Sequence, residues 1–181
     1  MIVLGISCYF HDSAACIIKD GKIVAAAAEE RFTRIKHDNN FPVKSIEFCL
    51  DSLGISANEV DLVSFYEKPL VKFERIISQH LDNFPKSYNQ FISKMGPWFG
   101  KRLKIRETLE EKVNYFGPIE YVEHHLSHAA SAFYLAPYDD ATIVTVDGVG
   151  EWATTTIGYG KNNKIEISKE IHFPHSLGLL Y

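Results

Sequence analysis

The sequence predicts an α/β fold that consists of one βββαβαβα lobe and the start of a second one. Short apolar runs rich in β-branched residues recur along the chain, which is typical of strands. Segments with apolar residues at helical spacing separate several of these runs. Two of the runs, which end near residues 7 and 146, pass through polar, glycine-containing segments into further strands. The same order of elements therefore begins twice.

Three strands open the chain, followed by a polar segment over residues 30–40 and a helix. We expect the strands at Ile2–Ser7, Ala14–Lys19 and Lys22–Glu29. The Asp20-Gly21 pair is a hairpin signal between the second and third strands. From Val43 to Leu53 the apolar residues share one helical face, and Gly54 provides a stop.

The middle of the chain is predicted to be largely helical. A capping box at Ser56–Glu59 precedes a strand at Asp61–Tyr66. A long helical stretch then runs from Pro69 to Tyr115, with breaks near Pro85 and Gly96-Pro97. The remaining elements are a strand at Ile119–Val122, a helix at His124–Leu135 and strands at Thr142–Val146, Thr154–Gly158 and Ile165–Ile171.

Duplicated βββαβαβα lobes define the actin-like (RNase H-like) fold, in which the first hairpin of each lobe contributes a turn to a central cleft. We therefore predict a first lobe over residues 1–138 and the first three strands of a second lobe over residues 139–181. The tail Leu177–Tyr181 is too apolar for an exposed terminus. We expect that the full protein continues beyond it.

Composition and charge exclude several classes of function. The chain has 181 residues, 46% hydrophobic content and a net charge of -4, which is typical of a globular domain and gives no reason to expect nucleic acid or membrane as a partner. No apolar run approaches the roughly 20 residues of a membrane span, and no signal peptide is evident, so we expect a cytoplasmic protein. Cys8, Cys16 and Cys49 form no CxxC pair and are expected to be reduced thiols.

The strongest chemical signal is the segment Glu123-His-His-Leu-Ser-His128. On a helix, His124 and His128 project from one face one turn apart, which suits two imidazoles on one metal ion, whereas His125 points elsewhere. A surface histidine cluster is the alternative. The segment lacks the glutamate of the HExxH zinc-protease motif. Asp147, at the end of a predicted apolar strand, is the nearest candidate for a third ligand.

Glycines flank Asp147, and a second polar turn lies near the N-terminus. Gly148 and Gly150 would let the backbone approach an anion such as a nucleotide, although an ordinary acidic turn is the alternative. The turn after the first strand includes Ser7 and His11, which could contact a phosphate or a small carbonyl group, with His11 as a general base. Plain hairpin-turn residues are the alternative there.

Two groups of cations stand out. Arg31, Arg34 and Lys36 follow the third strand and would suit a phosphorylated substrate, although surface solvation is the default interpretation. Between residues 68 and 106 the chain has nine Lys or Arg and two acids. A solvated helical face is the favoured interpretation of this segment, and a docking or anion-collecting face is the alternative.

Five ordered motifs, GISCYFHDSAAC, EERFTRIKHDNNFP, HHLSHAAS, VDGVGEWATT and FPHSLGLLY, resemble the O-carbamoyltransferases of nodulation-factor and antibiotic biosynthesis. The resemblance runs from Met1 to Tyr181. It implies an actin-like domain similar to the tRNA threonylcarbamoyl-transfer protein, followed by an adenylate-forming domain outside this chain. It also implies carbamoyl phosphate and ATP as substrates, carbamoyl-adenylate as intermediate and a small-molecule hydroxyl acceptor.

Residue by residue, the resemblance implies His124, His128 and Asp147 as metal ligands, with iron expected first and zinc or manganese as alternatives. It implies His11 as the group that touches the carbamoyl moiety, and it places Arg31, Arg34 and Lys36 in a basic motif. A further acidic ligand would lie beyond Tyr181, so we expect this piece alone to be inactive. A homodimer is left open.

Three other functions compete with this interpretation. A sugar-kinase-like or chaperone ATPase would have no use for the HHLSH segment. A tRNA threonylcarbamoyl transferase shares the paired histidines, but VDGVGEWATT and FPHSLGLLY favour the small-molecule branch. A non-catalytic actin-like nucleotide-binding module is the third alternative, and metal analysis would separate it.

Overall fold

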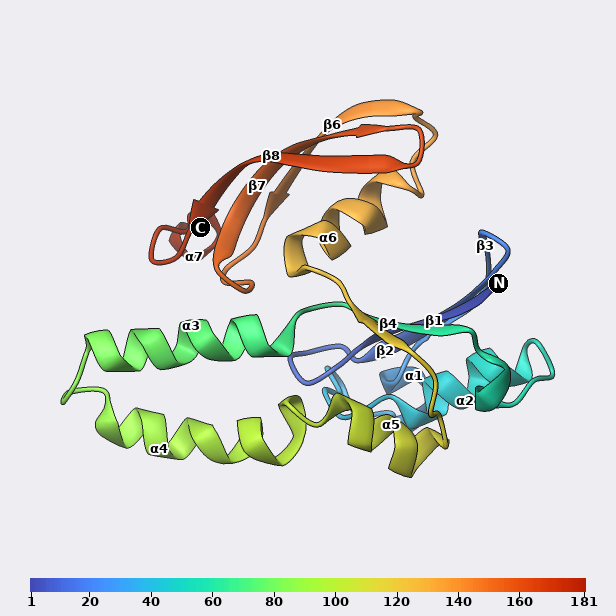
Figure 1. Cartoon of the computed structure of the whole chain (residues 1–181), viewed down its shortest axis with the longest axis horizontal. Coiled ribbons are helices and arrows are strands. Elements are labelled where there is room, and N and C mark those ends of the chain that lie inside the picture. The colour runs from blue at the N-terminus through green and yellow to red at the C-terminus, as the bar shows by residue number, and fades with distance from the viewer. The chain divides into compact units, whose positions relative to one another are not determined.

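The computed structural model describes residues 1–181, with the exception of the Lys94 side chain. The chain divides into two compact units (Figure 1). Unit 1 consists of Met1–Tyr66 and Ser93–Tyr121, and unit 2 of Glu67–Ile92 and Val122–Tyr181. The predicted two sets of strands form two separate sheets, of five and three strands.

The sheet of unit 1 has the order β3-β2-β1-β4-β5. Its strands are β1 (Ile2–Ser7), β2 (Ala14–Lys19), β3 (Lys22–Ala28), β4 (Leu62–Phe65) and β5 (Ile119–Tyr121). The first three strands pair antiparallel, and β4 lies parallel to both β1 and β5. This mixed order agrees with the first five strands predicted for a βββαβαβα lobe.

Helices α2 (Val43–Asp51) and α5 (Ile105–Val113) complete the core of unit 1. Leu4 and Ile17 alternate with less buried neighbours along their strands, and Ile46 and Leu109 add the helical side of the same core. Each of these four side chains is at most 1% exposed. Burial of this apolar surface supplies most of the free energy that holds the unit together.

Unit 2 contains the antiparallel meander β6 (Asp140–Val146), β7 (Ala153–Lys161) and β8 (Lys164–His172). Helix α6 (His124–Phe133) packs on this sheet (Figure 1). Its Ala129 and Phe133 form a buried cluster with Ile143 of the sheet. Helix α3 (Pro69–Asp82) belongs to the same unit. The predicted boundary at 138/139 assigns the residues of α6 to the first lobe, and it stays a prediction.

The short helical segments agree with the expected elements in part and differ from them in part. A short helix α1 (Glu30–Thr33) lies in the polar segment that was predicted without one. The capping box at Ser56 and Glu59 is present and opens η1 (Ala57–Glu59). Helix α4 (Tyr88–Pro97) continues to Pro97, and the expected break follows it as the π-helical turn η2 (Trp98–Arg102), because a proline disrupts the hydrogen bonds around it. The apolar tail forms a last helical turn, α7 (Leu177–Leu180).

The basic segment 68–106 is not simply a solvated face. Lys72 and Arg75 are 5% and 6% exposed, so that interpretation is wrong for these two residues. Lys72 pairs with the Glu67 carboxylate at 2.5 Å, and the Arg75 guanidinium lies over the Phe173 ring. The side chain of Lys94, a further member of the segment, lies outside the described part of the structure.

Two other expectations concern thiols and membranes. In the described part of the chain Cys8, Cys16 and Cys49 are thiols outside any disulfide, as predicted, and burial raises the pKa of the Cys49 thiol to about 11. None of the helices in the described part of the chain combines the length and the hydropathy that a bilayer crossing needs.

Candidate metal centre

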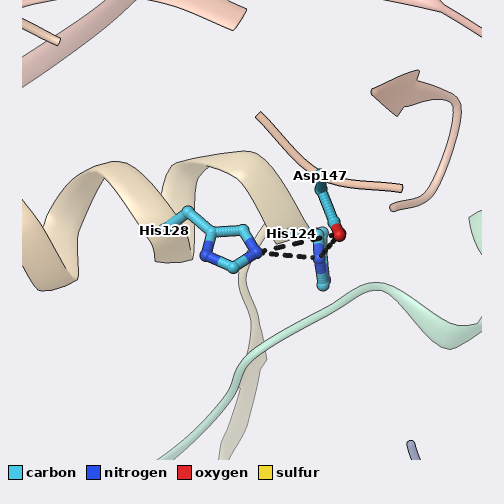
Figure 2. Close-up of side chains that lie close together, drawn as sticks. All are labelled: His124, His128 and Asp147. Carbon is cyan, nitrogen blue, oxygen red and sulfur yellow. Dashed lines mark hydrogen bonds and ion pairs between the residues drawn. The ribbon is translucent and has the colours of Figure 1, made fainter. Parts of the chain in front are cut away.

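Two histidines on the first turns of α6 and one aspartate after β6 converge in unit 2 (Figure 2). His124 Nε2 lies 2.7 Å from Asp147 Oδ2 and 3.1 Å from His128 Nε2. His128 Nε2 lies 3.8 Å from the same carboxylate oxygen. We call His124, His128 and Asp147 the triad. The helical spacing of four residues explains why the two imidazoles face one point.

Asp147 is held in place by its own loop. Its Oδ1 accepts a hydrogen bond from the Gly148 amide at 2.6 Å, and its backbone carbonyl accepts one from the Ser176 hydroxyl at 3.2 Å. Hydrogen bonds with His124, and then with His128, hold the pKa of the Asp147 carboxyl far below its usual range. The side chain is therefore a carboxylate that already points at both imidazoles.

The donor set fits a divalent transition metal. Two ligand atoms that each lie about 2.1 Å from one ion are themselves separated by about 3.0–3.4 Å. The three separations in the triad, 2.7, 3.1 and 3.8 Å, bracket this range. Two imidazoles and one carboxylate suit iron, zinc or manganese. Only small side-chain adjustments would be needed to bind such an ion.

One side of the triad is buried and the other is open. The His124 side chain is 8% exposed, whereas those of His128 and Asp147 are 50% and 25% exposed. A cavity of about 140 Å³ in unit 2 is walled in part by His124, Glu151 and His172. Three protein ligands with an open side are the arrangement that catalytic metal sites use, because a substrate or water needs a free coordination position.

His125 serves the structure of unit 2 and points away from the triad, as predicted. Its Nδ1 lies 2.6 Å from the Thr145 hydroxyl and its Nε2 lies 2.9 Å from the Ala153 carbonyl oxygen. Burial lowers the pKa of this imidazole, so it is neutral at physiological pH. In this way His125 links the start of α6 to strands β6 and β7.

The glycines near Asp147 have packing roles in this structure. A Cβ atom on Gly150 would lie 2.8 Å from His124 Cδ2 and 3.0 Å from the Ala153 carbonyl oxygen. The absence of a side chain at Gly150 therefore lets α6 approach the loop. The Gly148 amide binds the carboxylate of Asp147. Nucleotide binding by these two glycines stays a prediction.

Sequence reasoning missed two acids next to the triad. The Glu151 carboxylate accepts hydrogen bonds from the Lys68 amide at 2.6 Å and the His124 amide at 3.3 Å, at the starts of α3 and α6. Burial raises the pKa of the Glu151 carboxyl. Glu67 Oε2 lies 3.8 Å from His124 Nδ1. The nearest sequence signal was the position of Glu67 after a buried strand, the context in which Asp147 was singled out.

The other predicted site residues lie in unit 1. His11 Nδ1 lies 2.7 Å from Asp12 Oδ2, and His37 Nδ1 lies 2.8 Å from Asp12 Oδ1, so one carboxylate binds two exposed histidines. Asp12, His37 and Glu30 form a second group of possible ligand atoms, but all three are more exposed than His124.

The remaining predicted substrate-binding residues lie at the end of β1 and in the segment that follows β3. Ser7 ends β1 opposite Ala14. Arg31, Arg34 and Lys36 are exposed, and the Arg31 guanidinium lies 3.7 Å from the Glu30 carboxylate. Substrate binding by these four residues stays a prediction.

Comparison with known proteins gives one family for the whole chain. The family described as Carbamoyltransferase N-terminus matches residues 2–181. A Synechocystis protein, sll1178, is 50% identical over 99% of this chain and 30% of its own length. The nodulation protein NolNO of Sinorhizobium fredii is 32% identical over 96% of this chain and 25% of its own length. The chain thus spans less than a third of these relatives.

Among solved structures, YeaZ from Pseudomonas aeruginosa matches with a TM-score of 0.51 and 13% sequence identity. The match covers 96% of this chain and 66% of YeaZ. At this identity the likeness concerns the fold alone. The α/β, actin-like lobe and the start of a second lobe are therefore the fold of this chain, as predicted.

Proposed function

The chain belongs to the carbamoyltransferase N-terminus family, and we propose that it is the N-terminal part of an enzyme that transfers a carbamoyl group to a hydroxyl of a small-molecule acceptor. The observation that supports this proposal most directly is the convergence of His124, His128 and Asp147. An actin-like nucleotide-binding module without chemistry would not need two imidazoles directed at one carboxylate.

We assign carbamoyl phosphate and ATP as substrates and carbamoyl-adenylate as the activated intermediate. Hydrolysis of carbamoyl phosphate releases phosphate and gives carbamate, whose oxygen then displaces pyrophosphate from the α-phosphorus of ATP. In the transfer step, the acceptor oxygen forms a bond to the carbamoyl carbon, and the bond from that carbon to the AMP oxygen breaks. The hydroxyl proton leaves to a base, and AMP departs. Because the chain spans 30% and 25% of the length of two of its relatives, we assign the adenylate-forming part to the additional residues of a longer protein of this family.

The triad would hold one divalent ion, which would polarise a carbonyl oxygen as a Lewis acid. The chain's own contribution is to keep the ligands in position. The loop contacts of Asp147 and the early turns of α6 orient the three donor atoms before any ion binds. His128 and Asp147 are partly exposed, so that side of the triad is open to a small molecule.

His11 is our candidate for the base that takes the hydroxyl proton. Its Nδ1 faces the Asp12 carboxylate, which favours the tautomer that donates from Nδ1 and leaves Nε2 as a proton acceptor. This is the tautomer that a general base needs. Arg31, Arg34 and Lys36 are candidates for contacts with phosphate groups.

The test is metal analysis of the full-length protein combined with a turnover assay. Wild type is compared with His124→Ala/His128→Ala for bound iron, zinc and manganese, and for AMP release from carbamoyl phosphate and ATP with a panel of hydroxylated sugars. We expect the double variant to lose both the metal and the acceptor-dependent AMP release.

His80→Ala is the matched control, because it removes a histidine of the same unit that does not wall the cavity and whose ring lies against that of Phe91. This control should keep metal and turnover. A His124→Ala/His128→Ala protein that retained both would contradict the proposed site, and metal binding without any carbamoyl transfer would contradict the proposed reaction.

A further inference from the structure

The two ring nitrogens of His124 face different partners. Nε2 is the atom directed into the triad, 2.7 Å from Asp147 Oδ2. Nδ1, on the other side of the ring, is sealed from solvent and lies 3.8 Å from Glu67 Oε2. The imidazole therefore stands between two carboxylates, one from the loop after β6 and one from the segment after β4.

Glu67 is itself buried and paired. Its side chain and that of Lys72 are both 7% exposed, and Lys72 Nζ lies 2.5 Å from Glu67 Oε2. Lys72 is on the first turn of α3, directly after the segment that contains Glu67. A buried carboxylate is costly unless a positive charge compensates it, and the ammonium group of Lys72 provides that compensation for Glu67.

A histidine that binds a metal through Nε2 must carry its proton on Nδ1. That N–H group needs an acceptor when it is buried, and a carboxylate in this position fixes the orientation of the ring and raises its basicity. A change of less than 1 Å in the distance between Nδ1 and Glu67 Oε2 would give a hydrogen bond.

We propose that Glu67 is a positioning residue for the metal centre, which orients His124 through Nδ1–H, and that Lys72 holds this carboxylate in place. The inference rests on the proposed metal site and adds two residues to it. Both lie more than 50 positions before His124 in the chain, and both belong to unit 2. Glu67 and Lys72 are predicted to set metal affinity without touching the ion.

Zinc titration of the metal-free full-length protein tests this inference. Glu67→Gln alone leaves the Lys72 ammonium buried beside a neutral amide, so the charge-balanced variant Glu67→Gln/Lys72→Met is the decisive one. The control is Glu123→Gln, which changes an exposed acid adjacent to His124 in sequence that pairs with Lys68. Circular dichroism of each variant verifies that it is folded.

We expect Glu67→Gln/Lys72→Met to bind Zn²⁺ roughly 10- to 100-fold more weakly than wild type, the usual cost of losing an outer-shell partner of a ligand histidine. Glu123→Gln should bind Zn²⁺ like wild type. In the zinc-loaded protein, the His124 Nδ1–H resonance should lie far downfield and exchange slowly, and it should move upfield in the charge-balanced variant. If Glu67 and Lys72 only stabilised the fold, the Glu67→Gln/Lys72→Met variant would keep the His124 Nδ1–H resonance at its wild-type position.

The outcomes separate this inference from the metal site itself. If the charge-balanced variant binds Zn²⁺ like wild type and keeps the same Nδ1–H resonance, the role of Glu67 is overturned while the triad stands. If wild type binds no Zn²⁺, or His124→Ala/His128→Ala binds it equally well, the metal site is wrong and the inference falls with it.

Discussion

At the scale of single residues, Asp147 supplies the one negative charge among the three candidate ligands. It is held as a carboxylate by hydrogen bonds with His124 and His128. Asp147→Asn keeps the shape of the side chain but removes this charge. We expect its affinity for Zn²⁺ to fall by more than the roughly 10- to 100-fold effect of an outer-shell change. Isothermal titration of metal-free protein measures this, and an unchanged affinity would exclude Asp147 as a ligand.

Asp12 affects the titration of a neighbouring histidine, His37. Its hydrogen bond raises the pKa of His37, and the bonds from His37 and then His11 lower the pKa of Asp12. Asp12→Asn should therefore lower the pKa of His37, as followed by the NMR shift of its ring protons. Asp20→Asn, which changes an exposed acid bound to the N-terminus, is the control and should leave the His37 titration unchanged.

The contact between Asp12 and His37 should also make stability depend on pH. Because the folded-state pKa of His37 is raised, its contribution is fully present below the unfolded pKa and is lost as the pH rises through the folded pKa. As the pH rises from the unfolded pKa of His37 through its folded pKa, the free energy of unfolding of wild type should therefore fall toward that of Asp12→Asn. A difference in the free energy of unfolding between wild type and Asp12→Asn that grew as the pH rose through the pKa of His37 would contradict the assignment.

At the scale of elements, the approach of α6 to the loop after β6 depends on Gly150. A methyl group there would meet His124 Cδ2 at 2.8 Å and a backbone carbonyl oxygen at 3.0 Å, so the helix or the loop must move. We expect Gly150→Ala to lower the free energy of unfolding by about 1–3 kcal/mol and to weaken metal binding. Gly96→Ala in α4 is the control, because its Cβ would meet no atom within 4 Å.

Chemical denaturation and zinc titration of the same two variants check this prediction. A Gly150→Ala protein as stable as Gly96→Ala would show that the loop accommodates the methyl group without cost. Loss of stability without loss of metal affinity would place the adjustment in the loop instead of in the His124 ring.

Glu151 connects two helices, since its carboxylate accepts hydrogen bonds from the backbone amides at the starts of α3 and α6. Helix starts leave such amides without intrahelical partners, and each lost cap costs about 0.5–2 kcal/mol. Glu151→Ala should therefore destabilise the protein by about 1–3 kcal/mol, measured by denaturant unfolding. Glu123→Ala, which removes an exposed neighbouring acid, should have a much smaller effect.

At the scale of the whole molecule, the β6–β7–β8 sheet has one covered and one open face. Ile143 and Thr145 face α6, whereas Val144, Val146 and Ile157 are 41–59% exposed on the opposite face. Exposed apolar surface of this kind marks a contact region. Because the chain spans 30% and 25% of the length of two of its relatives, we expect the additional residues of such longer proteins to cover this face.

We therefore expect the 181-residue chain to bind the dye ANS more strongly per molecule than the full-length protein does. Val144→Ser/Ile157→Ser should lower the fluorescence of the isolated chain. As a control, Lys169→Ser replaces a polar residue that pairs with Ile157 in the sheet and should have little effect. Equal dye binding by the short and the full-length proteins would contradict the proposed coverage.

Much of this molecule could be predicted from local patterns. The two sets of strands, most of the helices and the convergence of His124 with His128 follow from periodicities of two and 3.6 residues, which act within a few positions of the chain. Asp147 was found because an acid that ends an apolar strand is unusual. The family followed from five motifs in order. The strand and helix ends were less certain, because tertiary contacts decide them.

Only the tertiary structure decided which distant side chains meet. Glu67, paired with Lys72, lies on the Nδ1 side of the His124 ring. Glu151 joins the starts of α3 and α6, and Gly150 leaves room for the His124 ring. No local sequence pattern relates these positions. Such partners are selected by close packing and by the need of buried polar groups for hydrogen bonds, both of which act between residues far apart in sequence. The sequence by itself determined the ligands of the candidate metal centre, and the packed fold determined the residues that hold them in place.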